Sequence, residues 1–236
     1  MPKLYIVPTP IGNLEDITLR ALRIFNEVEL ILCEDTRVSA KLLSHYNINK
    51  QTLSYHQFNE HKQLAHFIQL IRQSSSVALI SDAGTPGISD PGFLLIRECV
   101  KENIEIECLP GATAFVPALI NSALPSDSFY FYGFLPHKKG RQSAINYLST
   151  LKETFILYES PFRLLKTLEQ LAEYCGSERK VCVSRELTKI YEENVRTSLA
   201  EAIEYFSKKH LINSKCKYYL ATSDNGLSIF KDVTGN

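Results

Sequence analysis

The sequence predicts a two-domain α/β protein in which each domain is a sheet flanked by helices. Short apolar runs bounded by turn residues, which are typical of buried strands, alternate with segments of helical periodicity. Several of these runs pass into the next helix through a glycine- or proline-rich turn, as in parallel α/β sheets. The pattern restarts near Pro125, so we place the domains at residues 1–125 and 126–236.

The first half contains four predicted strands, at residues 4–7, 28–33, 77–80 and 104–109. We expect Asp16 to cap the first helix, which carries Leu19, Leu22 and Ile24. Further helices are predicted at residues 38–45, 60–73 and 91–102, and an apolar one from Thr113 to about Leu124.

The second half begins with an alternating aromatic strand at residues 129–134. Three more strands are predicted at residues 154–158, 181–184 and 217–222. Helices are predicted at residues 141–151 and 161–175, and we expect the tail after Asp224 to be frayed.

Composition excludes several classes of protein. The 236 residues are 44% hydrophobic and 22% charged, as in ordinary soluble proteins. Since 26 basic residues balance 26 acidic ones, no global field attracts nucleic acid, although a local basic patch stays open. The apolar runs are too short to span a bilayer and the start is unlike a signal peptide, so we expect a cytoplasmic protein without membrane partners.

The cysteines and histidines do not indicate a metal site. Six cysteines are widely scattered without a CxxC pair, and most lie in apolar runs, so we expect buried reduced thiols. The six histidines lack convincing ligand spacing, and no metal is expected.

Three loops share one design, in which a buried strand is followed by a Gly/Pro turn and a helix. They span residues 8–13, 82–92 and 110–113. In a parallel sheet they would emerge at one edge and form a pocket wall for a nucleoside-containing ligand. The alternative is that any α/β sheet has such turns. None matches GxGxxG or the P-loop pattern, which disfavours nicotinamide dinucleotides and nucleoside triphosphates.

Four charged segments also follow predicted strands, at residues 34–37, 136–141, 158–163 and 185–189. Charged side chains at the ends of strands can bind a ligand at the sheet edge, bind a phosphate, or act as an acid/base pair. Ion pairing, helix capping or a solvated loop explains each of them equally simply.

The order of these segments resembles the bacterial 16S ribosomal RNA cytidine 2′-O-methyltransferases, a branch of the tetrapyrrole (corrin/porphyrin) methylase superfamily. The matching segments are residues 5–14, 34–37, 81–92, 109–112, 134–141 and 185–189. The resemblance covers nearly the whole chain. The residue 81–92 loop together with the first-strand motif is highly specific, whereas the Pro-Gly loop is shared by the whole superfamily.

The resemblance implies two α/β domains of the tetrapyrrole-methylase fold, with S-adenosylmethionine in the cleft between them. It implies methyl transfer to the ribose 2′-hydroxyl of a decoding-site cytidine in the small ribosomal subunit, usually by a homodimer, with no DNA partner. By position, the implied cofactor residues are Pro10, Ile11, Gly12, Gly84, Thr85, Pro86, Ile88, Gly111, Ala112 and Thr113.

The reaction would be direct displacement at the sulfonium methyl, with the hydroxyl held in line roughly 3 Å away. A ribose hydroxyl needs its proton removed, and we hypothesise that Glu186 or Lys189 does this beside Arg185. Candidate substrate-binding residues are Asp35, Arg37, Lys138, Lys139, Arg141 and Glu159.

Some positions depart from the family pattern. Phe162 stands where a histidine is common, residues 214–217 replace Lys-Gly-Glu, and Ala123 replaces a glycine. These changes concern the target side and the last strand. They leave three alternatives open: a relative that methylates a tetrapyrrole or a protein side chain, an inactive module that binds RNA or cofactor, and a sugar-phosphate enzyme.

Overall fold

The structure is a computed structural model that describes residues 2–56, 60–209 and 217–224. The chain divides into two compact units, Met1–Thr113 and Ala114–Asn236. This division precedes the boundary that we placed near Pro125. The reason is that helix α5 (Phe115–Ser122) packs against strands of the second unit, although its sequence continues the helix pattern of the first.

The first unit contains one parallel sheet in the order β3-β2-β4-β1-β5. Its strands are β1 (Lys3–Ile6), β2 (Leu30–Cys33), β3 (Thr52–Ser54), β4 (Ser76–Ile80) and β5 (Glu105–Cys108). Its helices are η1 (Leu14–Asp16), α1 (Leu19–Glu27), α2 (Thr36–His45), α3 (Glu60–Gln73) and α4 (Phe93–Lys101). The parallel α/β prediction is confirmed, and only the three-residue β3 was missed, since it is too short to show a pattern.

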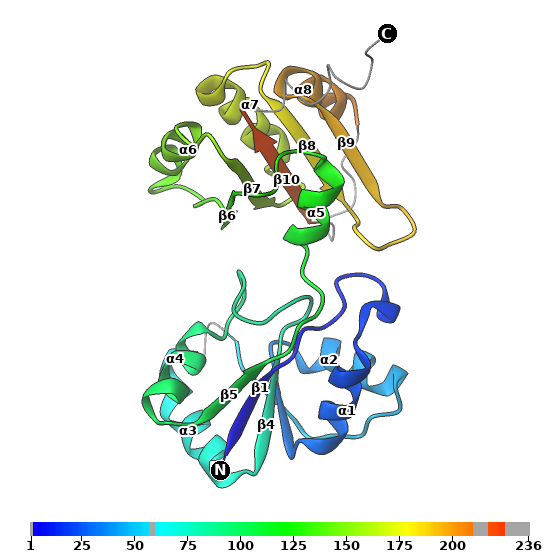
Figure 1. Ribbon diagram of the computed structural model, residues 1–236, viewed down its shortest axis with the longest axis vertical. Coiled ribbons are helices and arrows are strands. Elements are labelled where there is room, and N and C mark those ends of the chain that lie inside the picture. The colour runs from blue at the N-terminus through cyan, green and yellow to red at the C-terminus, as the bar shows by residue number, and fades with distance from the viewer. Residues whose placement is uncertain (1, 57–59, 210–216, 225–236) are drawn as a thin grey trace. The chain divides into compact units, whose positions relative to one another are not determined.

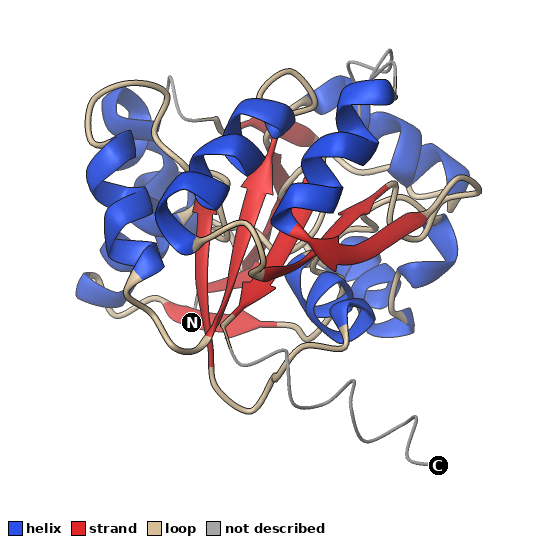
Figure 2. Ribbon diagram, turned by 90° about the horizontal axis from the view of Figure 1, so that it is seen from above, coloured by secondary structure: helices blue, strands red, loops and turns tan. Residues whose placement is uncertain are grey.

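Both faces of this sheet are covered, so its strands are apolar at successive positions. Leu4 and Ile6 of β1 face a core shared with α3 and α4. The alternate strand positions, such as Val7 and Ile31, face a second core shared with α1 and α2. The two helix pairs flank the strands in Figure 1, and Figure 2 separates helices from strands by colour.

The second unit contains a mixed sheet in the order β6-β7-β10-β8-β9. Only β6 and β7 are parallel, and the other pairs are antiparallel. The strands are β6 (Phe129–Phe134), β7 (Thr154–Glu159), β8 (Lys180–Arg185), β9 (Glu193–Ser198) and β10 (Tyr218–Ser223). Besides α5, the helices are α6 (Arg141–Ser149), α7 (Leu164–Cys175) and α8 (Leu199–Lys208).

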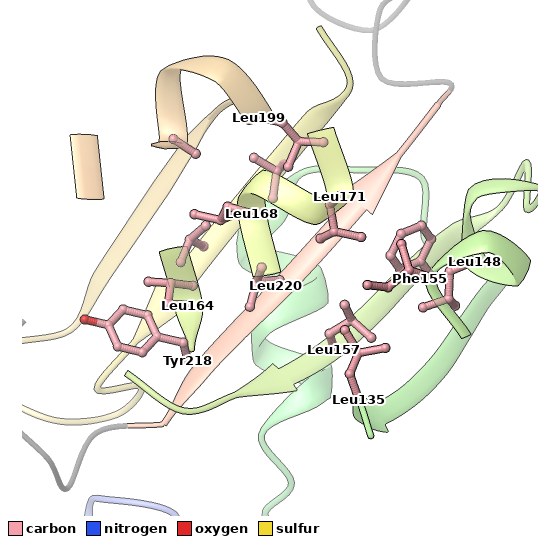
Figure 3. Packing of buried hydrophobic residues seen from close by; sticks show 14 of the residues in the cluster. Leu135, Leu148, Phe155, Leu157, Leu164, Leu168, Leu171, Leu199, Tyr218 and Leu220 are labelled. Atoms are coloured by element: carbon pink, nitrogen blue, oxygen red, sulfur yellow. The ribbon is translucent and has the colours of Figure 1, made fainter. Parts of the chain in front are cut away.

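The two faces of the second sheet are covered unequally. Helices α6, α7 and α8 bury one face in a large core, where Leu148, Leu168 and Leu199 meet Leu157 and Leu220 (Figure 3). Helix α5 covers part of the opposite face through a small cluster that includes Leu119 and Ile156.

Helix starts differ from the sequence prediction in two places. The side chain that caps α1 is Thr18, which accepts a hydrogen bond from the Ala21 N–H, whereas Asp16 ends the preceding 3-10 turn. Helix α8 begins with a capping box between Ser198 and Glu201. We predicted neither α8 nor β9, because β9 is a largely polar strand at the sheet edge.

Five cysteines lie in the described ranges, and all five are free thiols. Cys33, Cys99 and Cys182 are buried, as predicted, whereas Cys108 is exposed. Burial raises the pKa of the Cys99 thiol to about 12. Within residues 2–56, 60–209 and 217–224, no helix is both long and apolar enough to cross a bilayer.

Candidate functional site

Two of the predicted ligand loops are joined by backbone hydrogen bonds in the first unit. The Thr9 N–H donates to the Gly84 carbonyl at 3.0 Å, and the Gly84 N–H donates to the Thr9 carbonyl at 2.9 Å. This pair forms an antiparallel bridge beyond the carboxyl ends of β1 and β4. The two loops therefore form one connected layer at the edge where open α/β sheets bind ligands.

Hydroxyl groups tie this layer together and connect the third loop to it. The Thr9 hydroxyl donates to the Ser81 carbonyl at 2.9 Å, and the Ser81 hydroxyl donates to the Gly84 carbonyl at 3.1 Å. The Thr85 hydroxyl donates to the Ala112 carbonyl at 3.1 Å. All three predicted loops are thus held by specific side chains.

The loops converge on Gly84. Its φ of +93° lies in the region that favours glycine, and a Cβ built there would lie 3.5 Å from Ile11 Cγ2 and 3.8 Å from the Ala112 carbonyl oxygen. Gly111 makes an even closer approach, since a Cβ there would lie 2.7 Å from Pro8 Cβ. Glycine at these positions lets the three backbones meet closely.

The ten predicted cofactor residues all lie on these loops of the first unit. Gly84 and Pro86 are buried within the layer, whereas Gly12, Ile88 and Gly111 are exposed. The remaining five are half-buried, namely Pro10, Ile11, Thr85, Ala112 and Thr113. The structure brings this set together, and their role in binding remains a prediction.

The charged segment after β2 begins helix α2. The Asp35 side chain caps the helix by accepting from the Arg37 N–H and also pairs with the Arg37 guanidinium at 2.6 Å. The hydrogen bonds from Arg37 lower the pKa of Asp35 to about 2. The Asp35 N–H in turn donates to Asp82 Oδ1 at 3.1 Å, which connects α2 to the loop after β4. The alternative of local ion pairing and capping therefore describes this segment, while the Arg37 side chain is 87% exposed.

A cavity of about 220 Å³ lies beside these loops, within the first unit. Its lining comes from the loop after β1, from α2 and from the end of β4: Thr9, Pro10, Leu14, Val38, Ser39, Lys41, Leu42, Ile80, Ser81 and Asp82. Sequence reasoning did not single out Lys41 or Asp82. The position of Asp82 could have indicated its role, because it follows the buried strand β4 by two residues. Ligands of open α/β sheets bind at the carboxyl ends of the strands.

Two predicted substrate residues of the second unit are buried. The Glu159 side chain is 0% exposed and accepts hydrogen bonds from the Ser160 N–H at 2.8 Å and the Thr167 hydroxyl at 2.6 Å. Arg163 pairs with Glu159 at 2.9 Å. Arg141 is 6% exposed and donates to Thr167, Gln170 and the Pro136 carbonyl. Arg141 and Glu159 thus belong to an internal polar cluster, because both hydrogen-bond to the Thr167 hydroxyl and their charged groups lie 3.6 Å apart.

The two lysines of the basic turn lie on the surface. Lys138 and Lys139 are exposed, and Gly140 adopts a left-handed conformation at the start of α6. Phe162, which replaces the family histidine, is 77% exposed. The departure at residues 214–216 lies outside the described residues.

The candidate acid/base residues lie on the connection between β8 and β9. The Lys189 ammonium donates to Glu186 Oε1 at 2.9 Å, and Arg185 pairs with Glu193. Glu186 and Thr188 have φ of +52° and +66°, a conformation that is uncommon for residues other than glycine. Burial raises the pKa of Glu193, but hydrogen bonds from Lys209, Tyr205 and Arg185 outweigh it and bring the pKa to about 2.

No group of three His, Cys, Asp or Glu side chains with metal-binding geometry occurs in the described part of the chain.

The chain matches a known protein family over most of its length. The family model described as tetrapyrrole (corrin/porphyrin) methylases matches residues 3–203. The chain belongs to this family. The matched range spans both α/β units and includes the three loops that meet near Gly84.

Two curated relatives are similar to this chain over almost their whole length. A Hydrogenobaculum protein named "Ribosomal RNA small subunit methyltransferase I" is 49% identical over 214 residues, covering 90% of this chain and 93% of the relative. A Thermotoga maritima protein of the same name is 45% identical, covering 89% of this chain and 94% of the relative.

A solved structure confirms the fold at much lower identity. The uroporphyrin-III C-methyltransferase from Thermus thermophilus, complexed with S-adenyl homocysteine, superposes with a TM-score of 0.65. The identity is 16%, and the match covers 94% of this chain and 97% of that chain. The predicted tetrapyrrole-methylase fold is confirmed, whereas the expected place of the cofactor between the domains stays a prediction.

Proposed function

We propose that this chain is an S-adenosylmethionine-dependent methyltransferase that modifies the ribose 2′-hydroxyl of a decoding-site cytidine in 16S ribosomal RNA. The observation that carries the proposal is the convergence of three family loops on Gly84, held by the Thr9 bridge and the Thr85 hydrogen bond. The names of relatives at 45–49% identity support RNA of the small subunit as the acceptor.

The loops suit a nucleoside-containing methyl donor. Gly84 has a left-handed conformation and the neighbouring side chains are small, so backbone N–H and C=O groups can lie close to a ligand. These groups can form hydrogen bonds with the polar atoms of a nucleoside. The Thermus structure of the same fold is described as a complex with S-adenyl homocysteine. When bound, S-adenosylmethionine supplies a methyl group activated by a sulfonium. Pro10, Ile11 and Gly12, then Gly84 to Pro86 and Ile88, then Gly111 to Thr113 would hold it.

The protein's own contribution is to hold this layer in one conformation. The Thr9, Ser81 and Thr85 hydroxyls fix the loops before a ligand arrives, so little ordering is left to the binding step. Because methyl transfer requires an in-line approach at roughly 3 Å, this rigidity serves the reaction directly.

We propose that the pair formed by Glu186 and Lys189 moves the proton of the ribose hydroxyl, beside Arg185. The positive φ of Glu186 and Thr188 supports this, since residues in sparsely populated backbone regions concentrate at functional sites. We expect Glu186→Ala and Lys189→Ala each to lower the methylation rate about 100-fold, the lower range for a lost acid/base group. Full activity of both variants on small-subunit substrate would contradict this assignment. Lys208→Ala, which removes an exposed lysine of α8, is a matched control.

The decisive experiment maps 2′-O-methylation along 16S RNA in cells with and without the gene for this chain. One cytidine of the decoding site should lose its methyl group, and the purified protein should restore it on isolated small subunits with labelled methyl donor. Label in a porphyrinoid or a protein instead would favour the alternative acceptors. Binding of the donor without transfer would indicate an inactive relative, and no affinity for the donor would favour a sugar-phosphate enzyme.

The oligomeric state has its own measurement. We propose that the protein acts in the cytoplasm as a homodimer. Analytical ultracentrifugation at micromolar concentration should give twice the chain mass of 26.8 kDa, and a single-chain mass would contradict the dimer.

A further inference from the structure

We propose that the cavity beside the cofactor loops binds the base of the target nucleotide, and that Asp82 recognises the exocyclic amino group of cytosine. This inference rests on the proposed function and names the group that selects its acceptor. The cavity lies in the first unit, between α2 and the segments that follow β1 and β4.

The size of the cavity favours one ring system. Its volume of about 220 Å³ is smaller than the roughly 300 Å³ at which sites for whole drug-sized ligands begin. A complete nucleoside cofactor therefore exceeds it, whereas a single pyrimidine is within its range. The shared lining residues Thr9, Pro10 and Ser81 connect the cavity directly to the loops that we assign to the methyl donor.

The walls of the cavity provide apolar surface for a flat ring. Leu42 and Ile80 are buried and come from α2 and β4. Leu14 and Val38 also line the cavity, and because each is 39% exposed they provide apolar surface on its solvent side. Enzymes that act on an extruded nucleotide stack its base against such side chains.

The polar lining matches the edge of cytosine. Asp82 lines the cavity, and its Oδ1 accepts a hydrogen bond from the Asp35 N–H at 3.1 Å. A carboxylate has about four acceptor positions. Cytosine presents an amino donor at N4, for which aspartate is a common partner. Lys41 adds an ammonium donor to the lining that suits the cytosine carbonyl.

The same polar lining disfavours uracil. Uracil presents a carbonyl where cytosine has its amino group, and that oxygen would face the Asp82 carboxylate. An amino group beside a ring nitrogen is also found in adenine, so the test must separate the RNA base from the adenine of the cofactor.

The test uses Asp82→Asn, which keeps an acceptor for the Asp35 N–H and adds an amide donor. Small subunits reconstituted with cytidine or uridine at the target position serve as substrates, and kcat/KM of methylation is measured on each. We expect the wild-type protein to prefer cytidine at least tenfold and the variant to reduce this ratio about tenfold. Calorimetry should give the same S-adenosylhomocysteine affinity for both proteins. Asp127→Asn, an exposed aspartate of the second unit, is the matched control and should retain the ratio.

A second variant tests the cavity at a position where substitution should not disturb folding. Leu14→Trp fills the solvent side of the cavity from a side chain that is 39% exposed, so the core is untouched. We expect it to lower kcat/KM on cytidine subunits at least tenfold with unchanged S-adenosylhomocysteine affinity.

Three results would overturn the assignment. An unchanged cytidine-to-uridine ratio in Asp82→Asn, with active wild-type protein, would refute the role of Asp82 while leaving the proposed function intact. A tenfold loss of S-adenosylhomocysteine affinity in either variant would place the adenine in the cavity instead of the target base. Wild-type protein that methylates no small subunit would contradict the proposed function itself, and the base assignment with it.

Discussion

At the residue scale, backbone conformation and burial determine which contacts the predicted site residues can make. Gly84 lies where three loops meet, and its φ of +93° is one that other residues rarely adopt, so its backbone conformation favours glycine. Arg141 was predicted for RNA from its place in a basic run, but its side chain points into the second unit. Sequence shows the charge of a residue, whereas burial decides what that charge contacts.

Gly84→Ala should weaken binding of S-adenosylhomocysteine by at least tenfold. A Cβ at a φ of +93° costs about 1–2 kcal/mol. Because this Cβ would lie 3.5 Å from Ile11 Cγ2, at an ordinary contact distance, the expected disturbance of the loop comes from backbone strain. Titration calorimetry measures the affinity and urea unfolding measures the stability. Gly176→Ala is the matched control, because its φ is +89° and nothing lies within 4 Å of the added Cβ. It should show a similar loss of stability and an unchanged affinity, and equal affinities in both variants would contradict the role of Gly84.

Arg141→Ala should lower the free energy of unfolding by about 3 kcal/mol, in the range for breaking a buried charged cluster. The substitution removes the donors to Thr167 and Gln170 and leaves Glu159 with fewer cationic neighbours. Urea denaturation followed by circular dichroism measures the change. Lys138→Ala, in the same turn but exposed, should change stability by less than about 0.5 kcal/mol. Equal effects of the two substitutions would show that the buried cluster contributes nothing special.

At the element scale, the strands of the first unit could be predicted well because both faces of their sheet are buried. Apolar runs such as residues 77–80 appear in the sequence as continuous blocks, and the helices between them follow at once. The second unit was harder to predict. Strand β9 carries the polar sequence Glu-Asn-Val-Arg-Thr-Ser and is stabilised by pairing with β8, which no local pattern reveals.

Helix α8 depends on a cap that sequence inspection overlooked. The Ser198 hydroxyl accepts from the Glu201 N–H at 3.3 Å, and Glu201 accepts in return from the Ser198 N–H at 3.1 Å. Ser198→Ala should therefore cost about 1 kcal/mol of stability, the usual value for a lost N-cap. Thermal unfolding measures it, and Ser207→Ala near the end of the same helix should cost clearly less. A change near zero at Ser198 would mean that packing of Leu199 and Phe206 alone fixes the helix start.

The same cap predicts a pH dependence. The hydrogen bond from Thr197, together with those from Ser198, lowers the pKa of Glu201 to about 2, whereas an unfolded glutamate titrates near 4.5. Because the folded pKa is the lower one, this contribution is fully present above about pH 4.5 and is lost as the pH falls through about 2. The urea midpoints of the wild type and Glu201→Gln should therefore differ most at pH 6 and much less at pH 2.5. A constant difference at both pH values would exclude the carboxylate as its source.

At the scale of the whole molecule, the sequence predicted the family and the three loops but not which side chains line the cavity. The loops are continuous segments with unusual composition, so they can be recognised one at a time. Thr9, Lys41 and Asp82 are distant in sequence, and only the order of the parallel strands brings them to one cavity. In the second unit, Arg141 is the first residue of α6 and its side chain is buried, unlike those of Lys138 and Lys139 in the same turn.

Charge balance of the whole chain predicts how the protein binds its RNA substrate. With 26 basic and 26 acidic side chains, no global field adds to affinity, and several cations already pair with carboxylates, among them Lys3, Arg37 and Arg185. Lys138 and Lys139 are exposed cations in the family's basic turn, whereas the Arg141 side chain is buried.

Each phosphate contact contributes a slope of about −0.7 to −0.9 to log K against log salt. Affinity for small subunits between 50 and 200 mM salt, roughly the range over which such slopes are taken, should therefore follow a shallow slope of about −2. The double substitution Lys138→Ala, Lys139→Ala should bring that slope close to zero, while Lys208→Ala should leave it unchanged. A slope of about −6 or steeper would require a much larger basic surface than these two lysines, and it would show that the neutral chain gathers its cations into one patch.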